Sequence, residues 1–224
     1  MPIKIPRNVA KSRNEKIIEM CKNKKVLHIG ATNAPYTIKK YGHKIWPLLY
    51  REIDNVCKHQ LWIDIDKKWI KFLSDKWAEF EKSEMKYFDM NNLENLDYAP
   101  DVIVFGETIE HVFNIKIALD NLKKVMGKET LLIISTPNAY SLFPWAWNLI
   151  GYEFFNPDHK LIYTYWLLNN ALTMLWFNVH KFYFCKLDAK SGKIKYLVDN
   201  LLYYTFYKLF PQFYYNLLFI VKIK

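Results

Sequence analysis

The residues best suited to chemistry follow directly after a short apolar run in the middle of the chain. Residues 102–105 are apolar, Gly106 ends the run, and Glu107, Glu110 and His111 come within the next five residues. An imidazole accepts a hydroxyl proton near neutral pH, so His111 is a candidate general base. If a helix begins here, Glu107 shares a helix face with Glu110 or His111. These three residues are therefore the candidate catalytic set.

The same residues, Glu107, Glu110 and His111, are also a candidate metal site. Two carboxylates and an imidazole suit a divalent cation such as Mg²⁺. The alternative is a helix N-terminus enriched in acids, because the helix dipole favours negative charge there. We favour the helix N-terminus, and the metal site is the secondary hypothesis.

The elements around this cluster predict a strand–helix–strand unit. Residues 102–105 read as a buried strand, and apolar positions recur at helical spacing from Ile109 to Met126. A second buried strand follows at 131–135, and the Thr-Pro-Asn turn at 136–138 ends it. Such a unit makes its two strands parallel neighbours. Ligands of open parallel sheets bind beyond the carboxyl ends of the strands, where both polar segments are expected.

The remaining periodicity predicts one α/β domain over residues 1–224. Strands are expected at 25–29, 60–65, 85–88, 181–187 and 216–224. Helices are expected at 8–21, 43–57, after an N-cap at Asp66, at 161–176 and at 194–209. Three further segments of this domain are an arm and helix at 1–23, an aromatic lid loop at 139–158, and a helix and last strand at 188–224.

Two aspartates after successive strands point to a nucleoside. Asp64 lies near the end of the second strand, where a carboxylate can accept both ribose hydroxyls. Asp89 ends the third strand and can accept from the exocyclic amine of a purine, although it could equally cap a turn. Only Gly30 follows the first strand, and the chain contains neither a three-glycine dinucleotide fingerprint nor a P-loop. These features favour a nucleoside cofactor without a pyrophosphate, and S-adenosylmethionine is the common one.

Six segments resemble class I S-adenosylmethionine-dependent methyltransferases. The chain is most similar to those of bacterial polysaccharide and glycan gene clusters, and also to the ubiquinone-biosynthesis O-methyltransferases. The resemblance extends from about residue 24 to residue 187 and is carried by VLHIGATNAPYT (26–37), LWIDID (61–66), YFDMNNLENL (87–96), DVIVFGETIEHV (101–112), LLIISTPNAYSL (131–142) and PDHKLIYTYWLL (157–168). It implies a Rossmann-like, seven-stranded, mostly parallel sheet with an antiparallel last strand and helices on both faces.

The resemblance also implies roles for individual residues around S-adenosylmethionine. Gly30 would lie under the methionine part, Asp64 with Ile65 at the ribose, Asp89 with Met90 at the adenine, and Phe105 with Gly106 beside the sulfonium. His28 is also expected at the cofactor, at a position where relatives have an acid. The chain departs from the family again after Gly30, where relatives have a second glycine. Thr32 and Asn33 are the residues expected to replace the lost polar contacts.

The acceptor is expected on the aromatic side of the chain. His159 and Tyr163 are candidate acceptor contacts by resemblance. Tyr140 and Trp145 could stack on a sugar or quinoid ring, pack a lid, or face a membrane interface. A hydroxyl of a small molecule or glycan precursor is the expected acceptor, with a sugar favoured. The alternatives are a quinone or aromatic acceptor, an RNA methyltransferase, and a non-catalytic methyltransferase-like binding protein.

Composition restricts the setting and the partners. Three scattered cysteines without a CxxC pair favour a reducing, cytoplasmic compartment. The net charge of +10 is spread along the chain, which disfavours a nucleic-acid partner. Residues 161–180 lack charged side chains, but their one-faced apolar stripe predicts a packed helix rather than a membrane span. The charge and the aromatic lid also suit peripheral contact with the anionic inner membrane face, and the oligomeric state is left open.

Overall fold

The computed structural model describes residues 3–30, 49–68, 70–71, 80–153, 156–186, 201 and 203–224. Its described strands form one eight-stranded sheet in the order β1-β7-β8-β6-β5-β2-β3-β4. The strands are β1 Val9–Ala10, β2 Lys25–Ile29, β3 His59–Asp64, β4 Ser83–Tyr87, β5 Val102–Gly106, β6 Leu131–Pro137, β7 Phe177–Cys185 and β8 Asn216–Ile223. Strand β8 runs antiparallel to both β6 and β7, and every other pairing is parallel.

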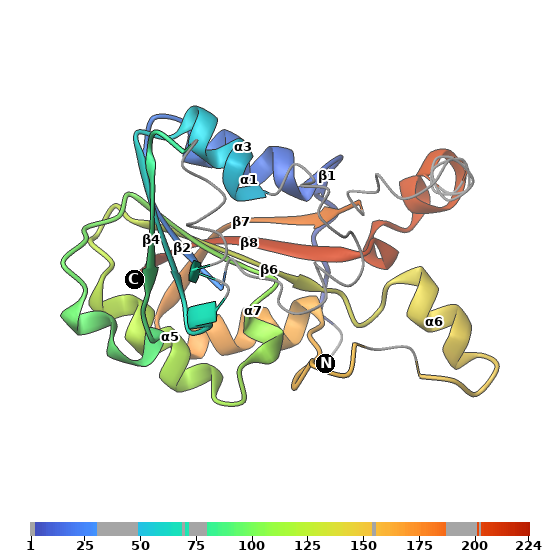
Figure 1. The fold of residues 1–224 in the computed structure, drawn as a ribbon. Helices are drawn as coiled ribbons and strands as arrows, with labels where there is room; N and C mark the ends of the chain where they lie inside the picture. The colour runs from blue at the N-terminus through green and yellow to red at the C-terminus, as the bar shows by residue number, and fades with distance from the viewer. Residues whose placement is uncertain are drawn as a thin grey trace.

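Helices cover both faces of this sheet (Figure 1). Helices α1 and α3 lie over one face, and α5 and α7 lie over the other, while α6 stands apart from the sheet. The helices are α1 Arg13–Cys21, α3 Leu49–Val56, α5 Ile115–Lys124, α6 Leu142–Asn148 and α7 Tyr165–Met174. Shorter helical turns are η1 Met90–Asn95, η2 Ile109–His111, η3 Tyr203–Tyr207 and η4 Pro211–Phe213.

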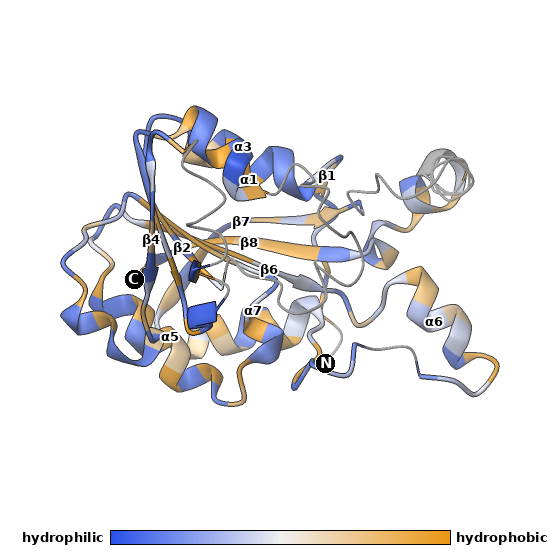
Figure 2. Cartoon of the chain, viewed as in Figure 1, coloured by the Kyte–Doolittle hydropathy of each residue, from blue (hydrophilic) through white to orange (hydrophobic). Residues whose placement is uncertain are grey.

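The core is divided by the sheet into two apolar layers. Alternate residues of β2 point to opposite faces, so Leu27 and Ile29 join the layer that includes α5 and α7 residues. Val26 joins the smaller layer under α1 and α3. The central strands are hydrophobic along their length, as Figure 2 shows, because both of their faces are covered. The predicted fold class is confirmed, and the two-residue strand β1 adds an eighth strand beside β7.

Several predicted boundaries are wrong for local reasons. The expected helix at 8–21 begins only at Arg13, because Val9–Ala10 forms β1 and Ser12 Oγ caps α1 by accepting from Glu15 N at 3.0 Å. The lid expected as a loop at 139–158 contains α6. The strand expected at 181–187 already begins at Phe177. The predicted helices at 43–57, after Asp66 and at 194–209 lie partly outside the described residues.

The helix expected from Ile109 is also interrupted. Residues Ile109–His111 form a single 3₁₀ turn, and α5 begins at Ile115 after Asn114, whose Oδ1 accepts from Ile117 N at 3.1 Å. Glu107 has a φ of 50°, which is outside the right-handed helical region. The predicted shared helix face of Glu107 with Glu110 or His111 is therefore wrong.

Helix α7 is a packed helix, as its sequence predicts. Leu168 and Leu172 are fully buried in the larger apolar layer. Among the residues that the structure describes, no helix combines the length and apolarity needed to cross a bilayer.

Candidate active site

Two cavities lie at the carboxyl ends of the parallel strands. The first has a volume of about 390 Å³ and is bordered by the ends of β2 and β3 and by the residues after β4. The second has a volume of about 440 Å³ and is bordered by the ends of β5 and β6 and by residues 156–162. His111 lines both cavities, and among the described residues it is the only one that does.

The first cavity brings together five of the predicted cofactor residues. These residues are Gly30, Asp64, Ile65, Asp89 and Met90. The other predicted cofactor residues do not line it. Phe105 is buried in the core, and Gly106 lies against the Ser135 hydroxyl. Thr32 and Asn33 lie outside the described residues.

The aspartates of the first cavity are held by local backbone contacts. Asp64 Oδ1 accepts from Asp66 N at 2.9 Å, which orients the carboxylate at the end of β3. Asp89 Oδ1 accepts from both the backbone and the side-chain nitrogen of Asn91, each at 2.9 Å. Asp89 therefore caps η1 and lines the cavity at the same time. Asp66 Oδ1 accepts from Lys68 N at 3.0 Å, which confirms its predicted role as a cap.

A glycine is needed at position 30 because two segments approach each other closely there. Its φ of +70° is a conformation that side-chain-bearing residues rarely adopt. A Cβ at this position would lie 2.5 Å from Thr108 Oγ1. The bend after β2 and the bend after β5 therefore meet at the floor of the first cavity, because position 30 has no side chain.

His28 does not line either cavity. It lies on the same face of β2 as Val26, and its ring is edge-on to Trp62 at 6.4 Å. Burial, with a smaller contribution from the Arg13 charge, lowers the pKa of His28 to about 3. The imidazole is therefore neutral at physiological pH. Its predicted role in cofactor binding has no contact in the structure to support it.

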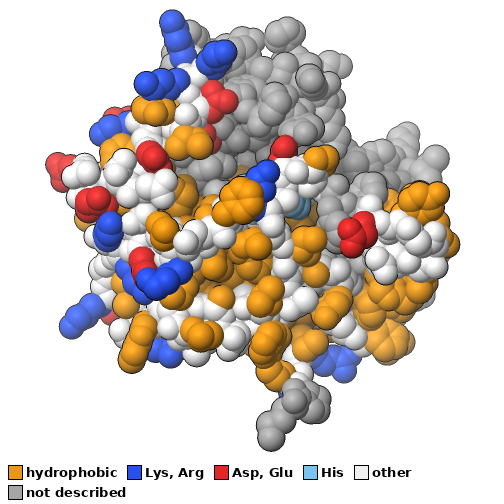
Figure 3. All heavy atoms as spheres, turned by 90° about the horizontal axis from the view of Figure 1, so that it is seen from below, with side chains coloured by type: hydrophobic (Ala, Val, Ile, Leu, Met, Phe, Trp, Pro, Cys, Tyr) orange, Lys and Arg blue, Asp and Glu red, His pale blue; other side chains and the backbone are white. Residues whose placement is uncertain are grey.

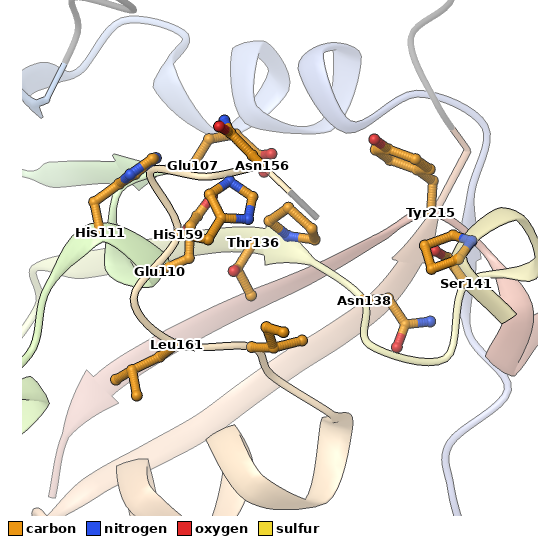
Figure 4. A pocket seen from close by; sticks show the side chains of 13 residues that line it. Glu107, Glu110, His111, Thr136, Asn138, Ser141, Asn156, His159, Leu161 and Tyr215 are labelled. Atoms are coloured by element: carbon orange, nitrogen blue, oxygen red, sulfur yellow. The ribbon is translucent and has the colours of Figure 1, made fainter. Parts of the chain in front are cut away.

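Glu110 is the most deeply buried acid of the second cavity (Figure 4). Its side chain is almost fully buried, and neither carboxylate oxygen accepts a hydrogen bond from the described residues. Burial, and then the neighbouring charge of Glu107, raise the pKa of Glu110 to about 8. The surroundings of Glu110 therefore favour its protonated form.

The Asp158 carbonyl determines which ring nitrogen of His111 carries the hydrogen. Its Nδ1 lies 3.1 Å from the Asp158 carbonyl oxygen. A carbonyl oxygen only accepts, so Nδ1 of the neutral ring carries the hydrogen and Nε2 keeps its lone pair. The His111 ring lies edge-on to the His159 ring, 5.0 Å away. The arrangement leaves one imidazole nitrogen of His111 able to accept a proton.

His159 is brought to this cluster by backbone hydrogen bonds. The Glu110 carbonyl accepts from Lys160 N at 2.7 Å and from Leu161 N at 3.1 Å. These bonds hold His159 Nε2 at 4.0 Å from Glu110 Oε1. Burial, and then the neighbouring His111, lower the pKa of His159. Figure 4 shows both histidines and Glu110 on one side of the cavity, with Ser141 and Tyr215 on the other.

Glu107 also lines the second cavity, but its Oε1 is bound by residues outside this cluster. Its Oε1 accepts from Arg13 Nη1 at 2.8 Å, from Asn216 Nδ2 at 3.0 Å and from Ser135 Oγ at 3.2 Å. Glu107 thus joins α1 and β8 to the end of β5.

The candidate metal-ligating set in the structure differs from the predicted one. Glu110, His111 and His159 each offer one ligand atom, and these atoms lie within 4.8 Å of one another. His159 therefore takes the place that the sequence gave to Glu107. One carboxylate and two imidazoles are a donor set that fits a divalent transition metal. The buried Glu110 carboxylate, unpartnered within the described residues, is compatible with that fit.

Three predicted acceptor residues lie away from the second cavity. Tyr140 lines a separate depression of about 240 Å³ beside Tyr165. Trp145 packs against Phe213 at 5.9 Å. Tyr163 is buried in the core, where burial and the charge of Glu110 raise its pKa to about 12. Of the four predicted acceptor residues, only His159 lines the cavity.

The structure adds lining residues that sequence reasoning missed. Asn156 is brought in by the turn before His159, and the Asn-Pro-Asp sequence of that turn was its available signal. Ser141 precedes α6 within the predicted lid. Tyr215 comes from the residue before β8, and nothing local to it indicated a site.

Comparisons with known proteins identify the family. Three solved structures are similar to the chain at low sequence identity. A SAM-dependent methyltransferase from Aquifex aeolicus has a TM-score of 0.60 and 13% identity, covering 95% of this chain and 90% of that chain. An S-adenosylmethionine-dependent methyltransferase from Clostridium acetobutylicum has a TM-score of 0.61 and 12% identity, covering 94% and 90%. The N-methyltransferase NodS from Bradyrhizobium japonicum, in complex with S-adenosyl-L-homocysteine, has a TM-score of 0.55 and 13% identity, covering 94% and 85%.

These similar structures support the fold assignment alone. The family assignment rests on a match to the sequence. No curated protein matches the chain. The family described as "Methyltransferase domain" matches residues 18–178, which is more than half of the sequence. This range includes the strand ends that border the two cavities. The chain therefore belongs to the methyltransferase domain family.

Proposed function

We propose that this protein transfers a methyl group from S-adenosylmethionine to a hydroxyl group of a small molecule or glycan precursor. The observation that carries the proposal is that His111 lines both cavities. A methyl donor in the first cavity and an acceptor in the second would meet at this residue. Methyl transfer depends mainly on such in-line positioning of the two reactants.

The first cavity suits the nucleoside part of the donor. Asp64 and Asp89 present carboxylate oxygens from successive strand ends, where ribose hydroxyls and an adenine amine can donate to them. Gly30 lets the backbone approach the ligand closely. The similar NodS structure contains S-adenosyl-L-homocysteine, the product of such a donor.

The second cavity suits proton removal from the acceptor. The acceptor oxygen attacks the methyl carbon as the carbon–sulfur bond breaks, and the bonding electron pair stays on sulfur. The hydroxyl proton passes to His111 Nε2, whose lone pair is free because Nδ1 faces the Asp158 carbonyl. His159 and Glu110 pack beside His111 and position it.

A sugar is the favoured acceptor, and a quinone or other aromatic alcohol is the alternative. Ser141, Asn156 and Tyr215 contribute a hydroxyl, an amide and a phenol to the lining, which suits a ligand with several hydroxyl groups. The preference for a glycan precursor rests on the sequence resemblance.

A divalent metal is an alternative to the general base, because the single lone pair of His111 would then bind the metal and could not accept the hydroxyl proton. Glu110, His111 and His159 would hold it, and when bound it would lower the pKa of an acceptor hydroxyl.

Calorimetric titration with S-adenosylhomocysteine tests the donor site. Asp64→Asn should weaken binding by about 10- to 100-fold, because a charge-assisted hydrogen bond to the ribose is lost. Asp66→Asn is the matched control, since Asp66 caps a helix and does not line the cavity. The proposal is wrong if the folded chain does not bind, or if both variants bind like the unaltered chain.

A further inference from the structure

Helix α6 exposes several large apolar side chains. None of its residues is buried, and Figure 1 shows it standing clear of the sheet. We define the aromatic surface as Phe143, Trp145, Trp147, Leu149, Ile150 and Tyr152, all of which are exposed. In the view from below, hydrophobic side chains gather at the right edge, where Figure 1 places α6 (Figure 3). Contiguous exposed apolar surface of this kind marks an interaction site.

Rings of the aromatic surface contact one another and the η4 turn. Trp147 lies edge-on to Phe143 at 6.2 Å and to Tyr152 at 5.9 Å. Trp145 contacts Phe213 of the η4 turn at 5.9 Å. This arrangement keeps the rings together while leaving their outer faces exposed. Tryptophan and tyrosine are the residues enriched where protein meets the membrane–water interface.

Two exposed cations, Arg7 and Lys208, and one acid, Glu153, belong to the segments next to the aromatic surface. Residues 139–152 contain no charged side chain, and Glu153 is the acid that follows them. The adjoining 206–213 segment carries the exposed Lys208, and the exposed Arg7 donates from Nη2 to the Leu209 carbonyl. The whole chain carries a net charge of +10. An apolar surface bordered by cations complements a bilayer that contains anionic lipids.

We propose that the aromatic surface docks this protein on the surface of an anionic lipid bilayer. The inference goes beyond the proposed methyl transfer and does not depend on it. The aromatic surface is continuous with the second cavity, because Ser141 and Pro144 of the α6 region line that cavity. Docking would therefore hold the mouth of the second cavity at the lipid surface, where the polar head of a lipid-linked molecule can enter.

Vesicle flotation of the full chain tests the docking. The vesicles contain phosphatidylcholine alone, or phosphatidylcholine and phosphatidylglycerol in equal amounts. The chain should float with the mixed vesicles at low salt and much less with the neutral vesicles. Leu149→Ser/Ile150→Ser should weaken binding roughly tenfold or more, because two apolar side chains no longer enter the interface. These residues are 67% and 64% exposed, so the substitutions leave the core intact.

Met174→Ser/Trp176→Asn is the matched control. These residues are 71% and 70% exposed. They lie just before Phe177, the first residue of β7, which pairs with Ile223 at the end of β8 farthest from the second cavity. Asn tolerates the positive φ of Trp176. The control should float like the unaltered chain.

Three results would overturn the proposal. The first is no flotation of the intact chain at low salt, and the second is equal loss of binding in both double variants. The third is a concentration-dependent dimer that Leu149→Ser/Ile150→Ser abolishes, because a second copy of the chain would then cover the aromatic surface.

Discussion

At the scale of single residues, the burial of Glu110 links its ionisation to the stability of the fold. Its pKa rises from 4.5 to about 8 because the carboxyl is desolvated and lies near Glu107. The folded state therefore holds the proton more tightly than the unfolded state. The resulting stabilisation is complete below about pH 4.5 and is lost as the pH rises through about 8.

Glu110→Gln should remove this dependence. The neutral amide cannot ionise, so the free energy of unfolding of the variant should fall less between about pH 4.5 and 8 than that of the unaltered chain. Urea unfolding across this range measures the difference. Glu129→Gln is the control, because Glu129 is exposed and Lys222 lowers its pKa. Parallel pH profiles for the unaltered chain and Glu110→Gln would contradict the shift.

His111 is the residue on which the proposed proton transfer depends. His111→Asn should lower kcat by about 10²- to 10⁴-fold with an acceptor that the intact chain methylates, because the general base is lost. His180→Asn, at an exposed position of β7, should have no effect. An unchanged kcat of His111→Asn at saturating acceptor would remove the general-base role.

At the scale of elements, the contact between the ends of β2 and β5 decides the shape of the first cavity. Gly30→Ala should destabilise the chain by about 2–4 kcal/mol, because the added Cβ requires a strained φ and collides with Thr108. Gly151→Ala shares the positive φ but meets no atom within 4 Å, so it should cost about 1–2 kcal/mol. Denaturant unfolding compares the two. Equal costs would show that the Thr108 contact yields without penalty.

At the scale of the whole molecule, the sheet order places the cavities. The chain passes from β2 to β3 and β4 on one side and returns to β5 and β6 on the other. The strand order therefore reverses between β2 and β5, and open α/β sheets bind their ligands at the carboxyl ends of the strands at such a point. Figure 1 shows the helices that cover the two faces of the sheet.

Ligand binding at this edge should stabilise the whole fold. S-adenosylhomocysteine at about 100 times its Kd should add about 2.7 kcal/mol to the free energy of unfolding. For a chain of this size, that corresponds to a rise in Tm of roughly 5–10 °C. Thermal unfolding with and without the ligand measures the rise. Asp64→Asn should show a smaller rise at the same concentration, because 10- to 100-fold weaker binding leaves about 0.4–1.4 kcal/mol of stabilisation. A rise of equal size in Asp64→Asn would place the ligand elsewhere.

The sequence by itself determined the parallel strands and the first cavity. Runs such as 102–105 and 131–135 are apolar because both sheet faces are covered, so the strand pattern is visible in local composition. Asp64 and Asp89 could be placed because Asp64 ends one strand and Asp89 closely follows the next, and parallel strand ends meet at one edge.

Only the tertiary structure decided the composition of the second cavity. Glu107 is held by Arg13 and Asn216, which lie far from it in the sequence and outside the cluster. His159 joins Glu110 through backbone bonds from Lys160 and Leu161 to the Glu110 carbonyl. Contacts of this kind depend on how distant segments pack. Hydrophobic periodicity indicates which face of a helix or strand is buried, but it does not indicate which distant side chain that face contacts.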